Sequence, residues 1–179
     1  MLMAVFCLGA SLIGINAQEK DWANLQRYAQ QNAELPKPDK NEKRVVFMGN
    51  SITEGWVNTH PDFFKSNGYI GRGIGGQTSY QFLVRFREDV INLSPALVVI
   101  NAATNDIAEN TGAYHEDRTF GNIVSMVELA KANHIKVILT TTLPAAAFGW
   151  NPAIKDAPQK IASLNARLKA AAGKVVVNI

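Results

Sequence analysis

Cysteine is nearly absent from the sequence, since Cys7 is the single cysteine among 179 residues. A chain with one cysteine cannot build the disulfide scaffold that stabilises many small secreted domains. Glycine and proline number 13 and 7, far too few for a collagen-like repeat. A hydrophobic fraction of 47% excludes an intrinsically disordered chain. The length and the composition are those of one globular domain.

An excess of charge of one sign is also missing. The chain has 18 Lys and Arg against 15 Asp and Glu, a formal net charge of +3. The basic residues form no cluster beyond residues 40–44. Nucleic-acid recognition needs a basic patch or stripe, so we expect no nucleic-acid partner. No spacing typical of metal ligands occurs, so we expect no metal site.

The first seventeen residues contain no charged side chain. Residues 2–15 are nearly all apolar or small, the length of a signal-peptide hydrophobic region and too short to cross a bilayer. The chain turns polar at residue 18, which predicts cleavage after Ala17 and a secreted or periplasmic protein with no membrane contact after cleavage. No Lys or Arg precedes the apolar run, and Ile15 is large for its position. A buried N-terminal helix is the alternative.

Apolar runs and amphipathic segments alternate along the rest of the chain. Strands are predicted at residues 44–49, 69–74, 96–102, 135–141 and 174–179, and helices at 21–34, from 51, and at 78–91, 121–133 and 158–172. The first helix would place Trp22, Leu25, Tyr28 and Ala29 on one face. Strands separated by helices pair in parallel through crossovers. We therefore predict a flavodoxin-like three-layer α/β/α sandwich with a parallel five-stranded sheet at 44–179, preceded by an N-terminal helix and linker at 18–43.

In such a sheet, ligands bind outside the carboxyl ends of the strands, so the residues after each apolar run are the informative ones. The first run ends in residues 49–54 (GNSITE). Ser51 and Glu54 have the spacing of a capping box, which needs no catalysis. Alternatively, the Ser51 hydroxyl lies at a helix N-terminus, where the dipole and the free amides favour a nearby oxyanion.

The second run ends in residues 71–78 (GRGIGGQT), which formally contain a G-x-G-x-x-G motif. As a dinucleotide site the motif is poor, because it follows a short second strand and no acidic residue closes the next strand. It could be a glycine turn that needs positive φ, or a backbone amide left open to a substrate oxygen. The third run ends in residues 101–106 (NAATND). Asn-Asp there is usually a turn or cap, but the Asn105 amide can also donate to a developing negative charge.

Taken together, the three strand exits resemble the SGNH hydrolases, also called GDSL esterases/lipases. The matching blocks are residues 47–53, 73–78 and 103–106, in the family's order and spacing. The resemblance implies an esterase that needs no cofactor, in which Ser51 is the nucleophile. It also implies an oxyanion hole formed by the N–H groups of Ser51 and Gly76 and the side chain of Asn105. Asn50 replaces the family's usual Asp, and Ala103 replaces a Gly.

The family takes its general base and orienting acid from an Asp-x-x-His block after the last strand. None of His60, His115 and His134 has an Asp three residues earlier, and the chain stops at Ile179. We therefore expect this chain, as written, to lack its general base and its C-terminal helix. We expect little esterase activity from it, because losing the base costs several orders of magnitude in rate.

The resemblance implies short-chain acyl esters as substrates, including O-acetylated carbohydrates. Asn50, Trp56 and Trp150 are the candidate substrate-binding residues, and the two tryptophans are candidates for stacking on a sugar. Two other functions remain open on the same fold. One is a non-catalytic carbohydrate-binding module, and the other is a nucleotide- or flavin-binding domain.

Overall fold

The computed structural model describes residues 21–172 and 176–177. The expected signal peptide at 1–17 lies outside the described residues. Within the described residues, no helix combines the length and apolar character that a bilayer crossing requires.

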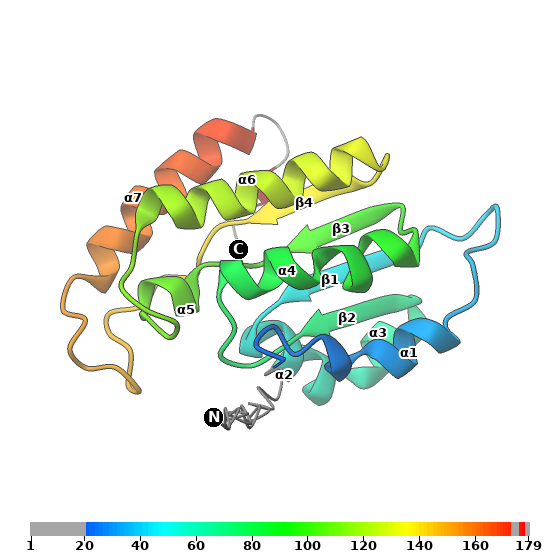
Figure 1. The fold of residues 1–179 in the computed structure, drawn as a ribbon, viewed down its shortest axis with the longest axis horizontal. Helices are drawn as coiled ribbons and strands as arrows, with labels where there is room; N and C mark the ends of the chain where they lie inside the picture. The colour runs from blue at the N-terminus through cyan, green and yellow to red at the C-terminus, as the bar shows by residue number, and fades with distance from the viewer. Residues whose placement is uncertain (1–20, 173–175, 178–179) are drawn as a thin grey trace, which may run out of the picture.

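A single sheet of five strands in the order β2-β1-β3-β4-β5 forms the centre of the molecule (Figure 1). The strands are β1 (Val45–Gly49), β2 (Tyr69–Gly73), β3 (Leu97–Ile100), β4 (Lys136–Thr140) and β5 (Val176–Val177). Every neighbouring pair is parallel. The predicted parallel five-stranded sheet is therefore confirmed.

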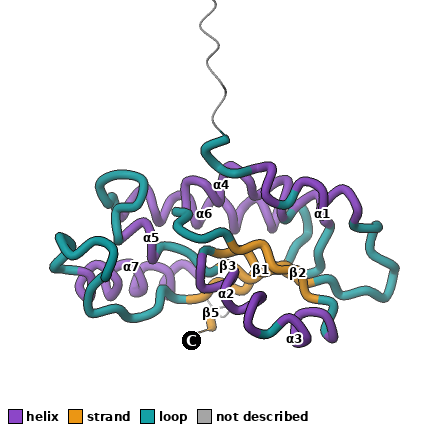
Figure 2. Tube along the Cα trace, turned by 90° about the horizontal axis from the view of Figure 1, so that it is seen from below, coloured by secondary structure: helices purple, strands orange, loops and turns teal. Residues whose placement is uncertain are grey.

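Helices cover the sheet in two layers. They are α1 (Ala29–Glu34), α2 (Ser51–Thr59), α3 (Pro61–Ser66), α4 (Ser79–Asp89), α5 (Thr104–Ile107), α6 (Glu116–Ala132) and α7 (Ala157–Ala172), with 3-10 turns η1 (Leu25–Arg27) and η2 (Ile91–Leu93). Seen edge-on, α4 and α6 lie on one side of the strands, and α2 and α3 lie on the other (Figure 2). The three-layer α/β/α prediction is confirmed.

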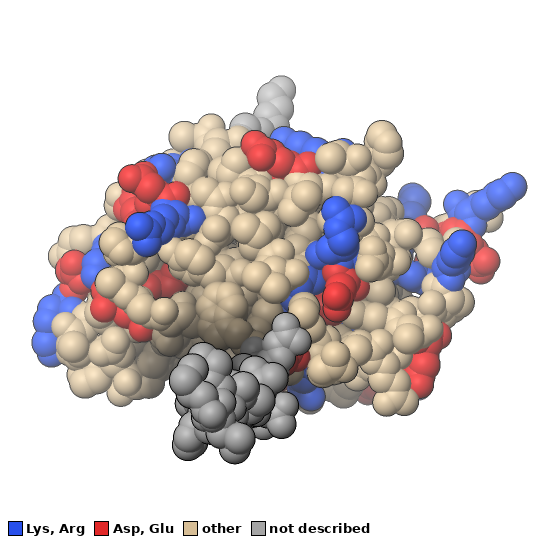
Figure 3. Space-filling view, viewed as in Figure 1, with Lys and Arg blue, Asp and Glu red and all other residues tan. Residues whose placement is uncertain are grey.

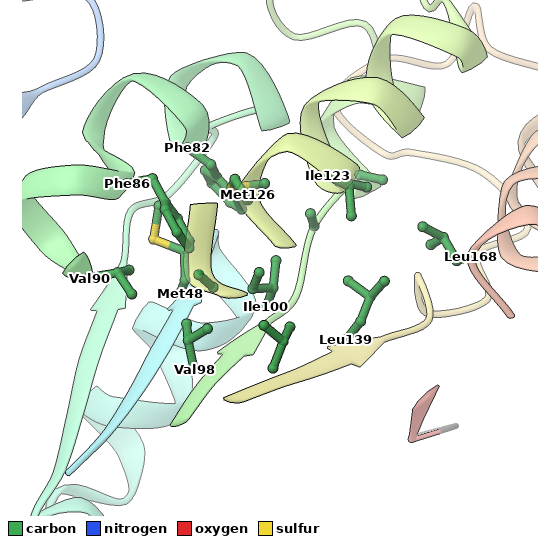
Figure 4. Packing of buried hydrophobic residues seen from close by; sticks show 14 of the residues in the cluster. Met48, Phe82, Phe86, Val90, Val98, Ile100, Ile123, Met126, Leu139 and Leu168 are labelled. Atoms are coloured by element: carbon green, nitrogen blue, oxygen red, sulfur yellow. The ribbon is translucent and has the colours of Figure 1, made fainter. Parts of the chain in front are cut away.

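The core lies between the sheet and the α4/α6 layer (Figure 4). Met48, Val98 and Ile100 from the strands are fully buried there. The facing helices contribute apolar side chains at helical spacing, among them Phe82, Phe86, Val90, Ile123, Met126 and Ala130. Burial of one such large side chain contributes about 1.5–3 kcal/mol. This packing fixes the strand ends on which the candidate site is built.

The N-terminal segment departs from the prediction of one helix at 21–34. The chain instead makes the 3-10 turn η1 and begins α1 only at Ala29. The cause is local: the Asp21 carboxylate accepts the backbone N–H of Leu25 at 2.8 Å, and Asn24 takes a left-handed φ of 54°. The predicted common face is wrong as well, since Trp22 is half-exposed while Tyr28 is buried.

Acidic and basic side chains are interspersed on the face that Figure 3 shows, and no basic stripe crosses it. Several of them pair with each other. Arg167, for example, lies 3.1 Å from Glu116 and 2.8 Å from Asp117. Exposed pairs of this kind contribute little to stability.

Candidate active site

The ends of three strands bring the predicted motifs to one edge of the sheet. β1 pairs with β2 on one side and with β3 on the other, and Gly49 is in register with Gly73. The segments that follow these strands therefore emerge side by side (Figure 1). They carry Ser51, Gly76 and Asn105.

Ser51 is the first residue of α2, but it does not cap the helix. The cap is Asn50, whose side-chain oxygen accepts the N–H of Ile52 at 3.0 Å. The capping-box interpretation of Ser51 and Glu54 is therefore wrong. Among the described residues, the exposed Ser51 hydroxyl and its backbone N–H have no hydrogen-bond partner. Asn50 is almost fully buried, so its side chain caps α2 from beneath the protein surface.

Glu54 acts on the neighbouring glycine loop. Its carboxylate accepts the N–H of Gly75 at 2.9 Å. A Cβ at Gly75 would lie 3.8 Å from the Cβ of Ser51, so this loop passes directly beside the serine. Gly76 follows with a φ of +75°, a conformation that favours glycine. The predicted positive-φ turn is confirmed there, and the Gly76 N–H has no partner among the described residues.

The other two glycines of the G-x-G-x-x-G motif serve packing. Gly71 and Gly73 lie within β2, underneath α2. A Cβ on Gly73 would overlap the backbone nitrogen of Glu54 and lie 2.8 Å from the carbonyl oxygen of Asn50. The spacing therefore reflects a close approach of helix and strand, and not a phosphate-binding turn.

Asn105 lies on the short helix α5 and is buried. Its side-chain nitrogen donates to the carbonyl oxygen of Gln77 at 2.9 Å, next to Gly76. A carboxamide has two N–H donors, so a second one remains. Ala103, which precedes α5, has a φ of +82°, where glycine would be unstrained. The family pattern has glycine at that position, and Ala103 adopts the left-handed conformation that a glycine would adopt. The loop conformation is therefore kept despite the substitution.

Asp106 holds the helices behind the site together. Its carboxylate accepts the backbone N–H of Ser79 at 2.9 Å, the Ser79 hydroxyl, and the Thr119 hydroxyl at 3.2 Å. Burial raises the pKa of Asp106, although these hydrogen bonds favour the charged form. The sequence predicted only a turn or cap here. In the structure, one side chain joins α4, α5 and α6.

A buried arginine fixes the same strand ends and escaped the sequence analysis. The Arg85 guanidinium donates to the carbonyl oxygens of Gly49 at 3.1 Å and Arg72 at 2.9 Å, and to the Gln77 side chain at 2.6 Å. Its ion-pair partner is Asp89, at 2.8 Å. In the sequence, Arg85 lies on the apolar face of a predicted helix. An unpaired charge buried there would cost free energy, so this position indicates a buried arginine with polar partners.

The two candidate tryptophans have different surroundings. Trp56 stacks on Phe63, with ring centroids 5.4 Å apart, and meets Phe47 edge-on. Its described contacts are thus with α3 and β1. The Trp150 indole N–H donates to the side-chain oxygen of Asn110 at 2.9 Å, and the Asn110 nitrogen donates to the Gly76 carbonyl at 3.0 Å. Of the two, only Trp150 is connected to the glycine loop.

None of the three histidines makes a hydrogen bond to Ser51 within the part of the chain that the structure describes. His60 joins α2 to α3 and bonds to Thr59, and His115 precedes α6. His134 lies before the amino end of β4, the opposite end of the sheet from Ser51, and lines an apolar cavity of about 600 Å³ that runs along β4. Between residues 21 and 172, no group of three or more acidic, histidine or cysteine side chains is placed to hold a metal ion.

The arrangement at the strand ends suits acyl-transfer chemistry. A hydroxyl lies at the N-terminus of α2, where the helix dipole and unpaired amides favour negative charge. The backbone N–H groups of Ser51 and Gly76 make no hydrogen bond among the described residues, and N–H donors of this kind are what an oxyanion requires.

Comparisons with known proteins identify relatives in sequence and in fold. The sequence profile described as GDSL-like Lipase/Acylhydrolase family matches residues 47–179. A crystal structure from Bacteroides fragilis NCTC 9343, assigned as an acylhydrolase, is 94% identical, with a TM-score of 0.88 over 89% of this chain and 78% of that chain. A GDSL-like lipase from Bacteroides thetaiotaomicron VPI-5482 is 76% identical, with a TM-score of 0.86 over 87% of this chain and 78% of that chain.

A curated relative is the uncharacterized lipoprotein YqeF of Bacillus subtilis strain 168. It is 32% identical in an alignment 117 positions long, which covers 56% of this chain. The match spans about half of that relative's own length, 48%.

Proposed function

The chain belongs to the GDSL-like lipase/acylhydrolase family, and on that basis we propose that it is a serine ester hydrolase with Ser51 as its nucleophile. The membership confirms the resemblance predicted from the three strand exits. In the proposed reaction, the Ser51 oxygen attacks the ester carbonyl carbon and forms a tetrahedral oxyanion. Collapse of this intermediate expels the alcohol and leaves an acyl-enzyme, which water hydrolyses to the free acid and the serine.

The observation that supports the proposal is that Asn50 and Ser51 have different roles at the start of α2. Because the Asn50 side chain caps α2, the Ser51 hydroxyl is not used in capping and stays exposed beside the glycine loop. The N–H groups of Ser51 and Gly76 and the second N–H of Asn105 are the proposed oxyanion donors. Attack also requires a general base for the serine proton. We assign the role of general base to no residue of this chain.

We propose short-chain acyl esters as substrates, O-acetylated carbohydrates among them. The support is Trp150, a residue that is 61% exposed and whose indole is connected to Gly76 through Asn110. An exposed indole face suits the C–H face of a sugar ring. We also propose that the protein acts outside the cytoplasm, because residues 2–15 have the composition of a signal-peptide hydrophobic region.

Hydrolysis of 4-nitrophenyl acetate tests the nucleophile. Ser51→Ala should remove the hydrolysis that the unsubstituted protein supports, because no other group takes the acyl chain. Asn105→Ala removes one oxyanion donor and should lower kcat about a hundredfold. Ser163→Ala is the matched control, since Ser163 is an exposed serine on α7. Hydrolysis that survives Ser51→Ala in a folded protein would show that the serine assignment is wrong.

A further inference from the structure

The glycine loop of the site is held from two sides. On one side, the Glu54 carboxylate accepts the N–H of Gly75 at 2.9 Å. On the other, the Asn110 side chain donates to the carbonyl oxygen of Gly76 at 3.0 Å. These two hydrogen bonds flank the Gly76 N–H. Because glycine rotates freely about its backbone bonds, the direction of that N–H depends on what holds the peptides around it.

The backbone of Asn110 belongs to the segment that follows Asn105. Its N–H donates to the Asn105 carbonyl at 3.0 Å. The next residue adds a second tie to the glycine loop, since the hydroxyls of Thr111 and Thr78 lie 3.1 Å apart. Asn110 therefore connects the two loops that carry the proposed oxyanion donors Gly76 and Asn105.

Chemistry fixes which way the Asn110 amide faces. An indole N–H is a donor only, so the Asn110 oxygen must face Trp150 at 2.9 Å. The amide nitrogen is then directed to the Gly76 carbonyl, which is an acceptor only. One carboxamide satisfies both neighbours in a single orientation, and the indole determines that orientation.

Trp150 is held firmly although its ring is exposed. It packs against the buried Phe148, with ring centroids 5.2 Å apart at 41°. The side chain of Asn151 donates to the Ala108 carbonyl at 2.9 Å and anchors the same loop. The indole is thus a fixed, solvent-facing aromatic surface next to the proposed oxyanion hole.

We propose that Asn110 is a positioning residue for the oxyanion hole and that Trp150 binds the sugar portion of the ester. This inference rests on the proposed esterase function and on the sugar substrate proposed above, and it adds to them the link between Trp150 and the oxyanion hole. Asn110 holds the peptide after Gly76 and Glu54 holds the peptide before Gly75, so the Gly75–Gly76 peptide between them is oriented with the Gly76 N–H toward the oxyanion. The Trp150 ring stacks on a pyranose face, and its N–H keeps Asn110 in the productive orientation.

Steady-state kinetics with two acetyl esters tests both roles, using glucose pentaacetate as the sugar ester and ethyl acetate as an ester without a ring. Asn110→Ala should lower kcat about tenfold for both esters and change KM less than twofold. Trp150→Phe keeps an aromatic ring and loses only the N–H, so kcat should fall about threefold. Trp150→Ala should also raise KM for glucose pentaacetate at least fivefold, with little change for ethyl acetate.

The double variant Asn110→Ala/Trp150→Phe shows whether the Trp150 N–H affects kcat through Asn110 or independently of it. If the indole N–H acts through Asn110, the double variant should have the same kcat as Asn110→Ala alone. Asn92→Ala is the control, an exposed asparagine in η2 at the opposite end of the sheet. Melting temperatures should stay within about two degrees of the wild type, because Asn110 is exposed.

The outcomes distinguish the inference from the function on which it rests. Hydrolysis that is left unchanged by Ser51→Ala would contradict the esterase proposal itself. Hydrolysis that depends on Ser51 but is unchanged by Asn110→Ala would contradict the positioning role alone. Equal KM effects of Trp150→Ala on both esters would contradict the sugar assignment.

Discussion

The charge of the buried Asp106 carboxyl group depends on its surroundings. The group accepts three hydrogen bonds from Ser79 and Thr119, and burial still raises its pKa. A raised pKa means that the folded protein binds this proton more readily than the unfolded chain does. The contribution of Asp106 to stability is therefore greatest below its unfolded pKa and declines as pH rises through the folded pKa.

Asp106→Asn should destabilise the protein, because an amide cannot accept from every donor that the carboxylate serves. One buried donor left without a partner costs about 1–3 kcal/mol. The difference in unfolding free energy between wild type and Asp106→Asn should be larger at acid pH and shrink as pH rises above the ordinary pKa of an aspartate. Urea unfolding at several pH values between 4 and 7 measures this difference. If the unfolding free energy of the wild type exceeded that of Asp106→Asn by an amount that grows with pH, the raised pKa of Asp106 would be contradicted.

At the same scale, the sequence left the role of Ser51 open because two functions competed for one hydroxyl. The structure resolves the competition through Asn50, whose side chain satisfies the N–H of Ile52. A capping pattern read from residue types cannot tell which of two adjacent polar residues has the non-helical backbone of a cap. Backbone geometry at Asn50, with φ of −102° and ψ of −149°, decides it.

At the scale of elements, the closest approach behind the site is that of α2 to β2. Gly73→Ala should separate them, since a Cβ there would overlap the backbone of Glu54. Overpacking typically costs about 1–3 kcal/mol, and here the clashing atoms are backbone that cannot rotate away. Because the shift would move Glu54 away from Gly75, activity should fall with stability. Thermal melts and 4-nitrophenyl acetate hydrolysis measure both effects.

Gly55→Ala is the matched control on the same helix. A Cβ at Gly55 would meet no atom within 4 Å. Alanine in a helix interior is about 0.5–1 kcal/mol more favourable than glycine, so this variant should be slightly more stable. A Gly73→Ala protein as stable as Gly55→Ala would show that the two elements are not packed through this glycine.

Whether an element could be predicted depended on how its residues are buried. β1, β3 and β4 are apolar runs inside the sheet, and α4 and α6 have apolar faces at helical spacing, so both kinds were found. The short helices α3 and α5 were missed, because one to two turns give no periodicity to detect. The helix expected at 21–34 starts late because the Asp21 side chain competes for the backbone N–H groups of its first turn.

At the scale of the whole molecule, the N-terminal segment is attached to the back of the candidate site. The Tyr28 hydroxyl donates to the carbonyl oxygen of Gly73, and Gln77 donates to the carbonyl oxygen of Ala23 at 2.7 Å. Sequence reasoning placed residues 18–43 ahead of the catalytic domain as a helix and linker. Those contacts could not be predicted, since they join polar groups more than forty residues apart and leave no periodic pattern.

Asn32 on α1 also connects the N-terminal segment to the rest of the fold. Its substitution tests how much this segment contributes to stability. Its side-chain oxygen accepts both Nε and Nη2 of the buried Arg72, at 2.9 and 2.7 Å. Its nitrogen donates to Asp89, the ion-pair partner of Arg85, at 2.7 Å. Asn32→Ala would thus leave groups at both ends of a buried charge network without a partner.

We expect Asn32→Ala to lower the free energy of unfolding by about 1–3 kcal/mol, because buried donors and acceptors lose their hydrogen bonds. Gln30→Ala, on the exposed side of the same helix, should change it by less than about 0.5 kcal/mol. Among the described residues, the Gln30 side chain bonds only to Glu34, at 2.8 Å. Urea denaturation of the two variants measures the contrast. Equal stabilities would mean that α1 merely covers the sheet edge, whereas the expected gap means that the N-terminal segment is part of the framework holding Arg85 against the strand ends.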